Sequence, residues 1–96
     1  MNEGKELDLM KIRQEIDFCD AELVKLFEQR IELSIKVADY KHATGKAIYD
    51  EEREKEKLDK IEAIVQDKDK AEYIRDLFKE IMANSRRIQL DRINNK

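Results

Sequence analysis

The sequence predicts an all-α protein with three helices per chain, in which a long first helix pairs with a second copy of the chain. The 96 residues include no proline and only two glycines, and helix-forming residues are abundant. Apolar residues recur at alternating steps of three and four, which is the spacing of one side of an α-helix. Charged residues make up 45% of the chain and hydrophobic residues 41%, which is too little apolar material for a thick core without a partner.

The first helix is expected over residues 6–42, with a length above about 50 Å. The two shorter helices of the same chain cannot cover a helix of this length, so we expect it to pair with a partner. A break follows at residues 43–47, where Gly45 can adopt a positive φ. Cys19 is expected to be a reduced core residue of the apolar stripe. The stripe comprises Leu9, Ile12, Ile16, Cys19, Leu23, Leu26, Arg30, Leu33, Val37 and Tyr40.

The second and third helices are expected over residues 50–66 and 70–92. Asp50 is a good N-cap for the second helix, and Asp69 is a candidate cap for the third. The second helix carries Leu58, Ile61, Ile64 and Val65, and the third carries Ile74, Leu77, Phe78, Ile81 and Met82, with Tyr73 on or near that side. All three helices are expected to form a single domain, residues 1–96.

Charge and composition exclude several classes of function. The net charge is −3 and no basic block stands out, which argues against a nucleic-acid partner. No apolar run is long enough to cross a membrane, and none follows the N-terminus as in a signal peptide. A single cysteine cannot form an internal disulfide. We therefore expect a cytoplasmic protein.

Polar side chains occupy positions that the helical pattern makes apolar. Arg30 lies within the stripe, Arg13 and Lys41 flank it, and the third helix continues into Ser85 and Gln89 on its apolar side. A buried cation costs free energy unless an anion neutralises it. Because the stripe offers few carboxylates, a small anionic ligand is the simplest explanation.

The spacing of these cations predicts a site shared between two chains. Arg30 and Lys41 are eleven residues apart, so they lie on one side of the helix about 16 Å apart along its axis. Arg13 precedes Arg30 by about 25 Å, which is too far for one small ligand to touch both residues of one chain. Arg13 is either unrelated to the site or belongs to a second site supplied by an antiparallel partner.

Each of these residues also has a structural explanation. An arginine in a helical stripe can set register, and a lysine near a helix end complements the dipole. Asp50 and Glu54 are typical of the first turn of a helix, whereas Arg53 opposes the dipole there. The occurrence of all these residues together favours a functional site over separate structural roles. Fixed cations and neutral donors suit a reaction without proton transfer or a covalent intermediate.

The pattern resembles the all-helical chorismate mutase family, the AroQ class, from about residue 9 to 89. The segments that carry the resemblance are Ile12–Asp17, Glu28–Arg30, Val37–Lys41, Ile48–Glu54 and Leu77–Met82, followed by Ser85 and Gln89. One departure is Glu51, where family members often have proline. The resemblance implies an intertwined helical homodimer, a free-standing mutase that converts chorismate to prephenate on the route to phenylalanine and tyrosine, and no cofactor or metal.

The resemblance also implies a role for each site residue. Arg30 and Arg53 would hold one or both substrate carboxylates or nearby oxygens from one chain, and Arg13 would reach in from the partner to a carboxylate. The catalytic pair Lys41 and Gln89 would contact the ether oxygen of chorismate. The remaining substrate contacts would come from Asp50 and Glu54 at the ring hydroxyl and from Ser85 near a carboxylate.

Two alternatives stay open. An isochorismate-pyruvate lyase on the same fold would keep Arg13, Arg30, Lys41 and Gln89, but would not explain Asp50, Glu54 and Ser85 together. A non-enzymatic helical dimerisation module would explain the stripe, but not the polar residues at core positions of the third helix.

Overall fold

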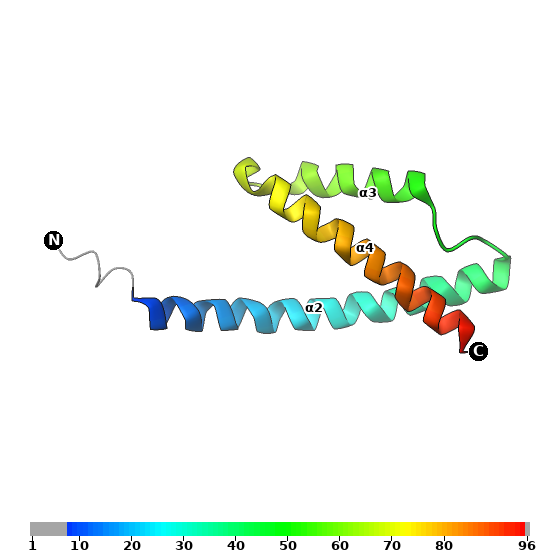
Figure 1. The fold of residues 1–96 in the computed structure, drawn as a ribbon, viewed down its shortest axis with the longest axis horizontal. Coiled ribbons are helices and arrows are strands. Elements are labelled where there is room, and N and C mark those ends of the chain that lie inside the picture. The colour runs from blue at the N-terminus through cyan, green and yellow to red at the C-terminus, as the bar shows by residue number, and fades with distance from the viewer. Residues whose placement is uncertain (1–7, 96) are drawn as a thin grey trace. The chain divides into compact units, whose positions relative to one another are not determined.

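The computed structural model describes residues 8–95, and within this range every regular element is a helix. The elements are α2 (Leu9–Thr44), α3 (Glu51–Ile64), the short 3-10 helix η1 (Lys68–Lys70) and α4 (Ala71–Asn94), as Figure 1 shows. The predicted all-α class with three helices and a long first helix is therefore confirmed.

The helix boundaries differ from the predicted ones by a few residues. The predicted start of the first helix, Glu6, lies outside the described residues. The helix continues to Thr44 because the chain leaves it at Gly45, whose φ is 70°. The amide of Lys46 donates to the carbonyl of Lys41 at 2.9 Å, which satisfies one of the carbonyl groups left open at a helix end.

The second helix is shorter than predicted and the third is longer. α3 ends at Ile64 because Val65 adopts an extended backbone, with φ −66° and ψ 124°. α4 continues to Asn94, and the side-chain amide of Asn95 donates to the carbonyl of Asp91 at 2.8 Å.

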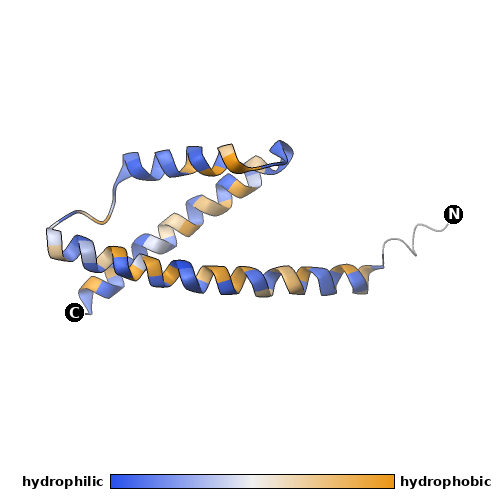
Figure 2. Cartoon of the chain, turned by 180° about the vertical axis from the view of Figure 1, so that it is seen from behind, coloured by the Kyte–Doolittle hydropathy of each residue, from blue (hydrophilic) through white to orange (hydrophobic). Residues whose placement is uncertain are grey.

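The chain divides into two units, residues 1–32 and 33–96, with the boundary inside α2. In the first unit the apolar stripe is exposed: Leu9 is 56% exposed, Ile16 51% and Leu23 58%. Figure 2 shows hydrophobic residues recurring along α2. Cys19 is also exposed, so its predicted place in a core is wrong for the single chain. Within residues 8–32, the described part of this unit, α2 is the only regular element.

The second unit contains the buried core. Its fully or nearly buried apolar residues are Ala38, Leu58, Ile61, Val65 and Met82. Within this unit α3 and α4 are joined by a short connection, and the C-terminal part of α4 lies against the last turns of α2, residues 33–44 (Figure 1). Several apolar residues expected on the buried sides are instead exposed, among them Ile64 at 73%, Tyr73 at 78% and Leu77 at 52%.

Local hydrogen bonds fix the starts of α3 and η1. Asp50 caps α3, as predicted, by accepting from the amide of Arg53 at 3.0 Å. The expected cap at Asp69 is wrong, because Asp67 accepts from the amide of Asp69 and caps η1 instead. The 3-10 turn moves the cap two residues upstream, and α4 then begins without a side-chain cap.

Candidate active site

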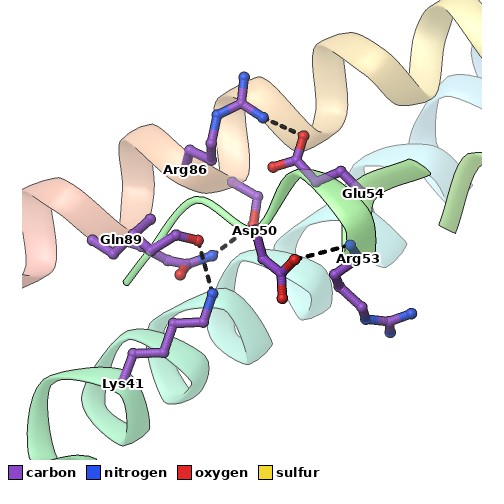
Figure 3. A network of polar contacts seen from close by, with 8 residues as sticks. Lys41, Asp50, Arg53, Glu54, Arg86 and Gln89 are labelled. Carbon is purple, nitrogen blue, oxygen red and sulfur yellow. Dashed lines mark hydrogen bonds and ion pairs between the residues drawn. The ribbon is translucent and has the colours of Figure 1, made fainter. Parts of the chain in front are cut away.

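The eight residues predicted to form the site are divided between the two units. Arg13 and Arg30 belong to the first unit. The second unit contains the other six, which come from the end of α2, the start of α3 and the C-terminal half of α4: Lys41, Asp50, Arg53, Glu54, Ser85 and Gln89. Figure 3 shows five of these six residues together with Arg86.

Lys41 is held at the end of α2 by a backbone carbonyl of the following segment. Its Nζ donates to the carbonyl of Ile48 at 2.8 Å, and the residue is half-buried. The turn at Gly45 brings this segment back toward the last turn of the helix. Because an ammonium group has three N–H donors, two remain for other oxygen atoms.

Asp50 and Arg53 are tied to each other through the helix cap. The Oδ1 atom of Asp50 accepts from the backbone N–H of Arg53 (Figure 3). The cap occupies one carboxylate oxygen, and the other stays available as an acceptor. Arg53 itself is exposed, so its guanidinium is accessible to a ligand.

Glu54 forms an ion pair with Arg86, which joins α3 to α4. Arg86 donates to Oε1 of Glu54, and both side chains are partly exposed, at 33% and 23% respectively. This hydrogen bond raises the pKa of Arg86. The guanidinium also lies over the ring of Tyr49, 4.9 Å from the ring centre, which is within cation–π range.

Ser34, Ser85 and Gln89 form a chain of hydrogen bonds between α2 and α4. The hydroxyl oxygens of Ser34 and Ser85 are 2.7 Å apart, and Nε2 of Gln89 donates to Oγ of Ser85 at 3.3 Å. Ser34 is 5% exposed and Gln89 is 7% exposed. Across residues 8–95, Oε1 of Gln89 is a buried side-chain atom without a hydrogen-bond partner, and such an atom costs free energy.

In the first unit, the two arginines differ in environment. Arg13 is exposed, whereas Arg30 is half-buried. Burial lowers the pKa of Arg30 by removing water from its guanidinium. An arginine remains protonated despite such a shift, so Arg30 keeps its charge.

Sequence reasoning missed Ser34 and Arg86. Ser34 lies four residues after Arg30, one helical turn away on the same side. Arg86 directly follows Ser85 and lies three residues before Gln89, so it is a helical neighbour of that amide. Both positions could have been found by extending the search one helical turn from each predicted residue.

A shallow hollow on the second unit does not coincide with these residues. It is lined by Ile35, Ile88, Asp91, Arg92 and Asn95, none of which was predicted to bind substrate. Most of the lining is apolar or engaged elsewhere, since Arg92 donates to the carboxylate of Asp39 at 3.0 and 3.2 Å. The hollow therefore adds no residue to the predicted set.

A comparison with protein families shows to which family the chain is similar. The chorismate mutase type II family matches residues 12–90. The chain belongs to this family. This membership confirms the resemblance seen in the sequence.

Comparisons with individual proteins add a partial relative. The T-protein of Haemophilus influenzae is 48% identical over 46 residues, which cover 48% of this mutase-family chain and 12% of that protein. The similarity thus involves a small part of the relative. No solved structure matched the chain. Between residues 8 and 95, none of the helices combines the length and apolar character of a membrane span.

Proposed function

We propose that the protein catalyses the intramolecular rearrangement of chorismate to prephenate. The family match over residues 12–90 carries this proposal. The cluster in the second unit supports it, because Lys41 and Gln89 supply N–H donors without a group that must gain or lose a proton. Chorismate is the only small molecule the proposal requires.

Binding is assigned to the charged residues. Chorismate is a dianion, and the protein carries a net charge of −3, so local cations have to attract it. Arg30 and Arg53 hold carboxylates, Ser85 supports one of them, and the partner's Arg13 completes the set. Asp50 and Glu54 accept from the ring hydroxyl. Clamping both carboxylates selects the compact conformer in which the reacting carbon atoms meet.

Rate enhancement is assigned to Lys41 and Gln89. In the rearrangement the C–O bond breaks ahead of C–C bond formation, so the ether oxygen gains negative charge. An ammonium and an amide N–H directed at that oxygen stabilise the transition state more than the ground state. Loss of one such donor costs about 3–4 kcal/mol of barrier, by analogy with oxyanion donors.

The proposal includes a homodimer in which residues 1–96 form one mutase domain per chain. The exposed stripe of the first unit supports it, since residues such as Leu9, Leu23 and Leu26 are 56%, 58% and 61% exposed. A side with this much apolar surface is typical of a helix that packs against a partner. A cytoplasmic location stays a prediction of the sequence.

The test is to incubate the purified protein with chorismate and to identify the product by NMR. Prephenate formed much faster than in buffer alone is the expected result. If chorismate is unchanged, the mutase proposal is wrong, and the same assay with isochorismate tests the lyase. If neither substrate reacts, the helical dimerisation module remains.

A further inference from the structure

The proposed site combines a dianionic substrate with two protein carboxylates, Asp50 and Glu54. Like charges held close together repel each other, so the negative charge of each carboxylate has to be compensated for the substrate to bind. The charge of Asp50 is compensated in part by the helix dipole at the start of α3, where its Oδ1 accepts from the amide of Arg53. Glu54 is a full turn further along the helix and needs another partner.

Arg86 is the group that meets Glu54. The two side chains form a hydrogen-bonded ion pair across α3 and α4, and Figure 3 shows the guanidinium directed at the carboxylate. The ring of Tyr49 lies 4.9 Å from the guanidinium and restrains it from a second direction. Arg86 is therefore fixed beside a proposed substrate-binding group.

We propose that Arg86 is a positioning residue of the mutase site, which neutralises and orients Glu54 so that a dianionic substrate can bind beside it. This inference rests on the proposed function. Without Arg86, the cations Lys41 and Arg53 would face two carboxylates in the second unit, and the two signs would balance. With Arg86 present, the cluster keeps an excess of positive charge.

A purely structural role for this pair is less economical, because α3 and α4 are already joined elsewhere. Arg75 of α4 lies 3.3 Å from Glu62 and 3.7 Å from Asp59 of α3. Leu58, Ile61 and Met82 are buried in the unit that contains both helices. The Arg75 pair links the same two helices away from the proposed site, and so provides a matched control.

The experiment measures KM and kcat for chorismate in four variants and the wild-type protein. Arg86→Leu removes the charge, Arg86→Lys keeps it, and Arg86→Leu combined with Glu54→Gln removes both charges. Arg75→Leu breaks a comparable α3–α4 ion pair. Thermal unfolding of each variant at one protein concentration reports whether the fold persists.

The expected result is a rise in KM of about 1.5- to fivefold for Arg86→Leu, the range for a partly exposed charge pair, with a smaller change in kcat. Arg86→Lys should restore most of the affinity, and the double variant should bind better than Arg86→Leu alone. Arg75→Leu should lower the unfolding temperature while leaving KM unchanged.

Several outcomes would overturn the inference. If Arg86→Leu lowers the unfolding temperature as Arg75→Leu does but leaves KM unchanged, the pair only joins the helices. If the lysine and leucine variants raise KM equally, charge is not the relevant property. Should Arg86→Leu fail to fold, the KM values of Arg86→Lys and of the double variant are compared instead. A KM of Arg86→Lys that is no lower than that of the double variant would then overturn the inference. Absence of chorismate turnover by the wild type would instead refute the proposed function, and the inference with it.

Discussion

Replacing Ser34 by alanine tests whether the hydrogen-bond chain from α2 to α4 orients Gln89. Ser34 is 5% exposed, and its hydroxyl lies 2.7 Å from that of Ser85, which accepts from Nε2 of Gln89. Nε2 has two N–H donors, so one binds Ser85 and the other stays available for a substrate oxygen. With Ser34 also donating to Ser85, the Ser85 hydroxyl accepts from both neighbours, holds the amide in place, and keeps its own hydrogen for a substrate carboxylate.

Two magnitudes follow from this geometry. The substitution removes one hydrogen bond whose net value is about 1 kcal/mol, and in a domain of this size that lowers the unfolding temperature by about 4–8 °C. Because Gln89 itself remains, the decrease in rate is smaller than the decrease expected when a donor is removed. We expect kcat to fall about two- to tenfold, with KM nearly unchanged.

The assay follows the loss of chorismate absorbance in Ser34→Ala, Ser85→Ala and the double variant. If the chain acts as a unit, the effects on kcat are not additive, because either single substitution already breaks it. The reasoning is refuted if Ser34→Ala keeps the wild-type kcat while its unfolding temperature falls, since the hydroxyl would then matter only for stability.

Three further predictions concern the cap, the amide and the dimer. Asp50→Ala should lower the free energy of unfolding by about 1 kcal/mol through loss of the α3 cap; an unchanged urea midpoint would contradict this. Gln89→Glu should be active only at acidic pH, because burial raises the pKa of a carboxyl group and only its protonated form donates a hydrogen bond; a pH profile that retains neutral activity would disprove it. Inactive Arg13→Ala and Arg30→Ala proteins, mixed and allowed to exchange subunits, should regain activity, because one of the two mixed sites is intact; no recovery despite demonstrated exchange would argue against shared sites.

Features set by local sequence were predicted correctly. Gly45 adopts the positive φ expected at the break, and Asp50 caps the helix that follows it. Both depend on residues within one turn of each other, so the sequence contains the relevant interactions. The cap of the third helix was predicted wrongly because Asp69 lies inside the 3-10 turn Lys68–Lys70, which Asp67 caps, and α4 begins without a side-chain cap.

Features set by distant contacts were less predictable. Arg86 follows Ser85 and precedes another arginine, so in the sequence it resembles a solvated charge; its role depends on Glu54, 32 residues away. Ser34 resembles a packing residue until Ser85, 51 residues later, lies against it. Cys19 was predicted to be buried because the apolar period identifies a side of the helix, whereas burial depends on what covers that side, and in the single chain it is exposed.

The bond from Lys41 to the carbonyl of Ile48 has a consequence for the entropy of binding. A free lysine side chain samples many rotamers, and fixing it costs up to about 2 kcal/mol. Here the carbonyl already confines the chain of four methylene groups at 2.8 Å, so most of that disorder is lost when the protein folds. An arriving anion then meets an ammonium that is already localised, and more of their attraction contributes to affinity.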